Sequence, residues 1–324
     1  MNVTVTRRLL PLVLLAACLL APAAAQAFTI GLSDQKTGMW QDPRFRQLGI
    51  RQVRLLVSYD LVLKGDFARY DRWMATAHAR GADVLLTINQ HHSGSASARP
   101  TVRQYRRVVR ILRKRYPWVT TMAAWNEANH KHQPLYKRPK LAARYYNVMR
   151  EECGGCDIVA ADVLDSSNML PWIATFKRYA RNPHIWGLHS YGDTNRFKPL
   201  GATATRQLLR AVHGDVWLTE TGGIVRFDER WRGGRAGERR AARAVERTFA
   251  VARMSPRVKR VYLYHWDADR RFVTWDSAFV AANGRARPAL AVLRREVNRQ
   301  RRKALEPLVP ALRTFPRRKL PLAF

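Results

Sequence analysis

The hydrophobic residues are distributed along the chain in a way that predicts alternating strands and helices. Short apolar runs rich in β-branched and aromatic residues recur eight times, and most of them are separated by segments with helical spacing. Phe67, Tyr70, Met74 and Ala77 form one helical stripe. The eight runs expected to be strands cover residues 28–34, 52–60, 82–90, 120–127, 157–165, 184–193, 216–221 and 261–267.

A second helical stripe has an arginine-rich opposite face, which is typical of a helix on the outside of a domain. The apolar positions of this stripe are Val102, Tyr105, Val108, Val109 and Leu112. Eight strand-helix units in succession favour a parallel sheet with right-handed crossovers, and they predict a single-domain α/β fold, the (β/α)8 TIM barrel. A doubly wound open sheet is the alternative, but residues 30–34 carry one glycine where its phosphate-binding fingerprint needs three.

The first 27 residues have the features of a secretory signal peptide. Arg7 and Arg8 precede an apolar run over 9–20, and Ala25 and Ala27 form a small-residue cleavage site before Phe28. We therefore expect a secreted or extracytoplasmic protein. Cys18 ends a Leu-Ala-Ala-Cys sequence that resembles a lipobox, so a lipoprotein remains an alternative. No other stretch approaches the ~18 apolar residues of a membrane span.

Charge is strongly biased toward arginine. The chain has 58 Lys and Arg against 24 Asp and Glu, which gives a net charge of +34. Such a surface attracts polyanions, so an anionic envelope polymer is one expected partner, without specific nucleic-acid binding. Residues 28–299 are expected to form the barrel domain, and residues 300–324 a basic, proline-containing tail.

The three cysteines are too few for a disulfide framework or a structural zinc cluster. Cys153 and Cys156 precede the fifth predicted strand and so lie at the end of the barrel opposite the expected chemistry. In an exported chain we expect them to form a local disulfide.

Carboxylates follow most of the predicted strands, where barrel enzymes build their active sites. Helix capping accounts for aspartates at such positions, but it does not call for Glu127 or Glu220. Eight acidic residues lie at or near the ends of the predicted strands, a third of all acids in the chain, so the sequence predicts an acidic barrel mouth. They are Asp34, Asp60, Glu127, Asp165, Asp193, Glu220, Asp267 and Asp269.

Glu127 and Glu220 end the fourth and seventh strands, so a barrel would place them across its mouth from each other. Cleavage of a glycosidic bond needs one carboxylic acid to protonate the leaving oxygen and one carboxylate to attack C1 or activate water. Burial and mutual repulsion would separate their pKa values into these two roles.

The ordered set of motifs resembles the clan A glycoside hydrolases, the retaining (β/α)8 group that includes families 5 and 39. The Asn126-Glu127 pair matches the family's strand-four motif, which implies that Glu127 is the general acid/base and that Asn126 bonds the sugar 2-hydroxyl. The strand-seven match implies that Glu220 is the nucleophile. His189 and Tyr191 match the strand-six His-x-Tyr motif, whose tyrosine donates to the nucleophile.

Three further matches imply substrate-binding residues at other strands. Arg54 matches the strand-two arginine, and a charged side chain inside an apolar strand is costly unless it is paired. His91 or His92 matches the strand-three histidine. Trp266 matches the strand-eight aromatic residue, which implies a floor under the sugar.

Other aromatic and imidazole side chains allow more than one interpretation. Trp40, Trp125 and Trp275 either stack on sugars or fill the core. His130 and His132 have metal-like spacing, but without a matching carboxylate we interpret them as cleft lining.

The sequence therefore predicts an exported retaining glycosidase that cleaves O-glycosidic bonds of a poly- or oligosaccharide without metal or cofactor. The alternatives are a catalytically silent carbohydrate-binding barrel and a polyanion-binding envelope protein.

Overall fold

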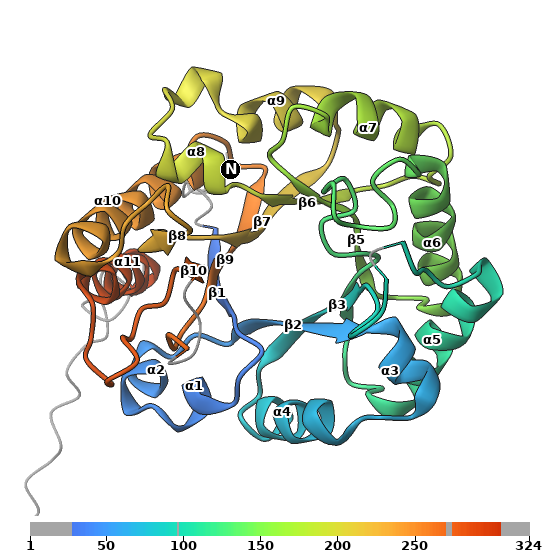
Figure 1. Ribbon diagram of the computed structural model, residues 1–324, viewed down its shortest axis with the longest axis horizontal. Coiled ribbons are helices and arrows are strands. Elements are labelled where there is room, and N and C mark those ends of the chain that lie inside the picture. Colours follow the sequence, from blue (N-terminus) through green and yellow to red (C-terminus); the bar gives the residue numbers. More distant parts are fainter. Residues whose placement is uncertain (1–27, 96, 270–273, 306–324) are drawn as a thin grey trace, which may run out of the picture.

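A computed structural model describes residues 28–305 except 96 and 270–273. Its centre is a closed barrel in which every neighbouring pair of strands is parallel (Figure 1). The predicted barrel and its eight strands are confirmed. In barrel order the strands are β1 (Thr29–Ser33), β2 (Gln52–Ser58), β3 (Asp83–Asn89), β4 (Thr121–Ala123), β5 (Asp157–Leu164), β6 (Ile185–His189), β7 (Asp215–Thr221) and β9 (Val258–Tyr264).

Helices surround the barrel (Figure 1). The two predicted stripes lie on α4 (Ala68–Ala79), with Phe67 as its N-cap residue, and on α5 (Val102–Arg115). Their apolar members are buried except Val102, which is partly buried. The other described helices are α1 (Gly38–Gln41), α2 (Pro43–Leu48), α3 (Tyr59–Lys64), α6 (Pro139–Glu152), α7 (Met169–Lys177), α8 (Tyr191–Asn195), α9 (Ala204–Ala211), α10 (Gly234–Ala252), α11 (Pro288–Leu305) and the 3-10 turn η2 (Leu200–Ala202).

Local sequence signals set several helix starts. Thr101 and Gln104 form a capping box at α5, in which each side chain accepts from the other residue's backbone N–H. Asp42 accepts from the Arg44 N–H at the start of α2, where Pro43 occupies the first turn.

Two hydrophobic clusters fill the fold, one between strands and helices and one inside the barrel. The inner cluster consists of Leu85, Ala123, Val159, Trp217 and Tyr262. Beyond it, the barrel interior becomes polar and holds Arg54 and Asp162, both fully buried. Gly187 makes room for this layer, since a Cβ there would lie 2.5 Å from Asp162 Oδ1.

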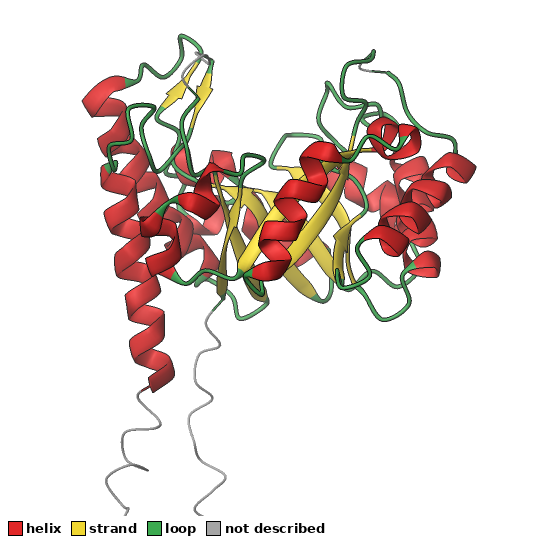
Figure 2. Cartoon of the chain, turned by 90° about the horizontal axis from the view of Figure 1, so that it is seen from below, coloured by secondary structure: helices red, strands yellow, loops and turns green. Residues whose placement is uncertain are grey.

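A small two-stranded antiparallel sheet stands above one side of the barrel (Figure 2). It pairs β8 (Arg226–Phe227), which follows β7, with β10 (Trp275–Asp276), which follows β9. We call residues 226–231 together with β10 the flap. Because both segments leave the carboxyl ends of barrel strands, the flap lies on the side where the site is expected.

The carboxyl-terminal boundary differs from the prediction. Helix α11 continues through residue 300 to Leu305, and Arg301 donates from Nη2 to the Leu48 carbonyl. The basic segment therefore begins as a helix packed on the barrel, and residues 306–324 lie outside the described part. The predicted signal peptide, 1–27, also lies outside it. None of the helices within the described residues has the length and hydrophobicity of a membrane span.

Candidate active site

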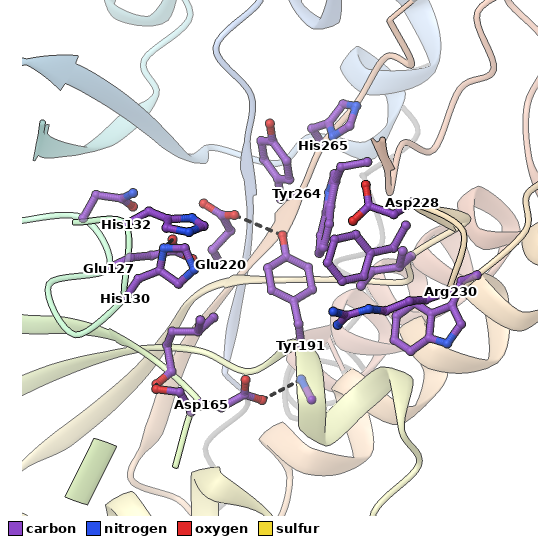
Figure 3. Close-up of a pocket in the computed structure, with 18 of the residues that line it drawn as sticks. Glu127, His130, His132, Asp165, Tyr191, Glu220, Asp228, Arg230, Tyr264 and His265 are labelled. Carbon is purple, nitrogen blue, oxygen red and sulfur yellow. Dashed lines mark hydrogen bonds and ion pairs between the residues drawn. The ribbon is translucent and has the colours of Figure 1, made fainter. Parts of the chain in front are cut away.

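A cavity of about 1130 Å³ opens at the carboxyl ends of the barrel strands. Glu127 and Glu220 both line it, together with Tyr191 and Tyr264 (Figure 3). Trp275 is also part of the lining. The two predicted glutamates are therefore brought into one cavity from β7 and from the loop after β4.

Glu220 is held by two donors at the end of β7. Arg54 Nη1 donates to its Oε2 at 2.6 Å, and the Tyr191 hydroxyl donates to its Oε1 at 3.1 Å. Both donors are buried, and 13% of the Glu220 side chain remains exposed to the cavity. A guanidinium keeps its proton throughout the accessible pH range, so Glu220 has a permanent positive charge beside it.

Glu127 has a different kind of partner. Its Oε1 lies 3.0 Å from His189 Nδ1, and its Oε2 lies 3.9 Å from His130 Nδ1. The backbone at Glu127 has φ of 47°, in the left-handed region that non-glycine residues adopt at a cost of about 1–3 kcal/mol. From this backbone position the Glu127 side chain reaches the cavity.

Asp162 on β5 joins the surroundings of the two glutamates. Its Oδ2 accepts from Arg54 Nη2 at 2.8 Å, its Oδ1 lies 3.3 Å from His189 Nε2, and it also accepts from the Thr219 hydroxyl. Arg54 Nη2 donates to Asn126 Oδ1 at 2.7 Å as well. Arg54, Asp162 and His189 thus form a fully buried cluster beneath the cavity, and this cluster contacts both glutamates.

The buried charges determine the protonation of this cluster. Burial opposes ionisation of Asp162, but the charges of His189 and Arg54 outweigh it and hold the Asp162 pKa below its usual range. Burial disfavours the His189 cation, yet the charges of Asp162 and Glu220 raise its pKa to about 10. As an imidazolium, His189 donates from both ring nitrogens, to Glu127 and to Asp162. Burial alone would raise the Glu127 pKa, and the bond and charge of His189 lower it instead.

A family model described as the glycosyl hydrolase catalytic core matches residues 75–292, more than half of the chain. The chain belongs to the glycosyl hydrolase catalytic core family. The predicted barrel glycosidase, an enzyme that cleaves O-glycosidic bonds, is thereby confirmed, and the catalytically silent alternative is not favoured.

Solved structures share the barrel of this glycosyl hydrolase at low sequence identity. Xylanase 10B from Thermotoga maritima is 12% identical with a TM-score of 0.62, and the match covers 86% of this chain and 96% of that one. A GH10 xylanase from Bispora sp. MEY-1 is 14% identical, with a TM-score of 0.63 and coverages of 84% and 97%. A GH39 β-xylosidase from Caulobacter crescentus is 14% identical, with a TM-score of 0.58 and coverages of 82% and 70%. Among curated proteins none matches the chain.

Four of the predicted substrate-binding residues of this glycosyl hydrolase lie at the same site as the two glutamates. Asn126 and Tyr191 line the cavity, whereas Arg54 and His189 lie beneath it and contact Glu220 and Glu127 from below. Arg54 is paired within its apolar strand, as its burial requires.

Trp266 does not form the floor under a sugar. It is fully buried, packs against Phe45 and Phe279, and donates from its indole to Asp42. Tyr264, the last residue of β9, lines the cavity instead, and Trp266 lies beyond the end of the strand.

The histidines after β3 also lie away from the cavity. His91 Nε2 is 3.4 Å from Asp60 Oδ2, and its ring packs against Tyr59. The backbone N–H of His92 donates to Asp60. Asp60 therefore anchors the loop after β3, and neither histidine is among the residues that line the cavity.

Of the six aspartates predicted at the barrel mouth, Asp34, Asp165 and Asp269 line the cavity and the other three do not. Asp193 caps α9 by accepting from the N–H groups of Ala204 and Thr205. Asp165 accepts from two backbone N–H groups, yet burial and the Asp193 charge raise its pKa to about 7. Asp34 also accepts backbone bonds, and burial raises its pKa to about 6. The carboxyl groups of Asp34, Asp165 and Asp193 therefore stabilise loops and a helix start by accepting backbone N–H groups.

The remaining predictions divide between cavity and core. His130, His132 and Trp275 line the cavity, whereas Trp40 and Trp125 are buried in the core. Across the described residues, no group of three or more His, Cys, Asp or Glu side chains is arranged to hold a metal ion.

Sequence reasoning missed Asp162 and the flap. Asp162 stands in the apolar run of β5, and the argument applied to Arg54, that a charge in such a strand needs a partner, applies equally to it. Phe227 and Trp231 line the cavity from the flap, for which the alternating strand pattern gave no signal.

The structure joins Cys153 and Cys156 by a disulfide between α6 and β5. This position is at the amino-terminal end of the barrel strands, opposite the cavity.

Proposed function

We propose that this chain is a retaining glycosidase in which Glu220 is the nucleophile and Glu127 is the general acid/base. The observation that carries the assignment is the difference between their buried partners. Arg54, beside Glu220, does not exchange protons, whereas His189, beside Glu127, does. A nucleophile must stay ionised through the cycle, and an acid/base must gain and lose one proton.

In the first step, Glu220 Oε attacks the anomeric carbon and the bond from that carbon to the glycosidic oxygen breaks. The leaving oxygen takes the proton of the Glu127 carboxyl, which leaves Glu127 as a carboxylate beside His189. In the second step, Glu127 removes a proton from water, the water oxygen bonds to the anomeric carbon, and Glu220 departs as a carboxylate. Two inversions give net retention.

The proposed substrate class is a β-linked xylo- or gluco-oligosaccharide. The similar structures are named as xylanases, a β-xylosidase and a β-glucosidase, and two of the xylanases are described with xylobiose. In this chain, Tyr264, Trp275, Phe227 and Trp231 supply flat aromatic surfaces along the cavity, which suit the apolar faces of pyranose rings.

Azide rescue tests the assignment of roles. Glu220→Ala and Glu127→Ala should each lower turnover of an aryl β-glycoside by about 10³-fold or more. Azide should restore Glu220→Ala with formation of the α-glycosyl azide, and Glu127→Ala with formation of the β-glycosyl azide. Glu246→Ala, which removes an exposed glutamate on α10, is the matched control and should retain activity. Near-normal turnover in both site variants contradicts the proposal.

We also infer that the chain is exported and that its basic surface binds an anionic envelope polymer. The signal-peptide pattern over 1–27 and the net charge of +34 support this. Amino-terminal sequencing of the protein from its native host should begin at Phe28. An intact Met1 would contradict export, and a lipid-modified Cys18 would favour the lipoprotein alternative.

A further inference from the structure

Basic side chains line the cavity beside the glutamates. They come from the loops after β1 and β4, from the segment after α8, and from the flap. The five lysines and arginines of the lining are Lys36, Lys131, Arg196, Lys198 and Arg230. A neutral sugar does not need this much positive charge.

Two of these five cations have partners in the fold. Lys36 donates to the Asp267 carbonyl, and Lys198 Nζ lies 3.6 Å from Asp193 Oδ1. Within the part of the chain that the structure describes, no carboxylate lies at ion-pair distance from Lys131, Arg196 or Arg230.

The carboxylates of the lining are mostly committed elsewhere. Glu127 and Glu220 are bound by His189 and Arg54, and Asp34 and Asp165 accept backbone N–H groups. Asp228 and Asp269 complete the acids of the lining. Among the described residues the lining has six acids and five cations, so it carries no overall excess of positive charge. The positive charge without a carboxylate partner is concentrated at Lys131, Arg196 and Arg230, where it would attract an anion.

Arg196 and Arg230 line the same cavity as a continuous aromatic surface. Tyr191 packs edge-on against Trp275 at 4.9 Å, and Trp275 packs against Phe227 at 5.1 Å, so the start of α8 adjoins the flap. Arg230 lies over the Phe227 ring at 5.4 Å, and Arg196 follows α8 directly. In the view of Figure 3, Arg230 lies on the other side of Tyr191 from Glu127.

We propose that the cavity selects a saccharide that carries a carboxylate, a uronic-acid-substituted β-linked oligosaccharide. The aromatic surface would support the sugar rings, while Arg196 and Arg230 bind the carboxylate of a unit outside the cleaved linkage. A guanidinium matches a carboxylate through two parallel N–H bonds. This inference rests on the proposed function and names the substrate class of the same site.

The test compares two substrates that differ in one group. A uronic-acid-bearing xylo-oligosaccharide and its carboxyl-reduced derivative have the same backbone and linkages. At low salt, the wild-type enzyme should hydrolyse the acidic form with a kcat/KM about tenfold higher, equivalent to about 1.4 kcal/mol. The preference should decline as salt screens the charges.

Charge variants locate the source of this preference. The double variant Arg196→Gln, Arg230→Gln should hydrolyse the acidic and the carboxyl-reduced substrates with about equal kcat/KM. Arg103→Gln, which removes the same charge type from the exposed face of α5, should keep the ratio and the activity.

Three outcomes overturn the inference. If the reduced substrate is hydrolysed equally well or better, the proposed preference for acidic substrates is wrong, while the proposed glycosidase function stands. If the double variant keeps the preference for the acidic substrate, Arg196 and Arg230 are not its source. Hydrolysis of neither form, together with failure of azide rescue on aryl glycosides, overturns the proposed function as well.

Discussion

Asp162→Asn is the substitution that most directly perturbs the buried cluster. Asparagine keeps the size of the side chain but removes the charge shared by Arg54 and His189, and its amide N–H groups face donors. Asp162 and Arg54 are fully buried, and removing one partner of such a pair costs about 3–5 kcal/mol in the free energy of unfolding.

The same substitution should change the pH dependence of activity in a defined direction. Without Asp162, His189 loses the charge that most strongly raises its pKa, so it becomes neutral at lower pH. Glu127 then loses the bond and charge that lower its pKa, while its burial remains. Losing the Asp162 charge itself acts on Glu127 in the opposite sense, but this is the weaker effect. His130, at 3.9 Å, is unchanged.

Activity requires protonated Glu127, so the alkaline limb of kcat/KM marks the loss of that proton in the free enzyme. The wild-type limb should therefore lie at acidic pH, and the Asp162→Asn limb should move to higher pH. The assay is kcat/KM against pH on an oligosaccharide, whose poor leaving group needs the acid. Turnover at the optimum should also fall, by up to about 10²-fold, because Arg54 is less firmly positioned against Glu220.

Asp193→Asn is the matched control, because Asp193 is also buried but caps α9. It should lower stability without moving the alkaline limb. His189→Gln removes the cation by a second route and should move the limb in the same direction as Asp162→Asn. An unmoved or lowered limb in both folded variants would refute the electrostatic reasoning.

Three further predictions concern stability and the aromatic donor. His189 has its pKa raised from 6.5 to about 10, so the stability that it contributes is complete below about pH 6.5 and is lost as the pH rises through about 10. Denaturant titrations should show unfolding free energy falling across this window by at most about 1.4 kcal/mol per pH unit, and His189→Gln should flatten the slope. Tyr191→Phe removes one donor to Glu220 and should cost about 1–3 kcal/mol of transition-state stabilisation, mainly as a lower kcat. An unaltered kcat would show that Tyr191 takes no part in catalysis. Cys153→Ser with Cys156→Ser opens a loop of sequence separation 3 and should destabilise by no more than about 2 kcal/mol in thermal or denaturant unfolding, and a larger loss would contradict the loop-entropy argument.

The barrel could be predicted from the sequence because its evidence is repeated. Eight apolar runs with intervening helical stripes leave few alternatives, and strand ends then place Glu127 and Glu220 at one mouth. Arg54 was predictable because a charge within an apolar strand demands a partner.

What could not be predicted depends on side-chain direction and on loops. Tyr264 ends β9 and Trp266 lies two residues beyond it, where the alternation of a strand no longer predicts which side chain faces the cavity. The flap pairs two residues on each side, too few for an alternating pattern. The aspartates after the strands accept backbone N–H groups from distant loops, so their structural roles become visible only once those loops are placed.

Covalent trapping tests the central claim, nucleophilic attack by Glu220, most directly. A 2-deoxy-2-fluoro β-glycoside with a good leaving group should form a glycosyl-enzyme and release it slowly, because the fluorine destabilises the oxocarbenium-like transition states. Peptide mass spectrometry should place one glycosyl group on Glu220, in the tryptic peptide covering residues 211–226. A label on Glu127, or turnover with inversion and no covalent adduct, would contradict the account.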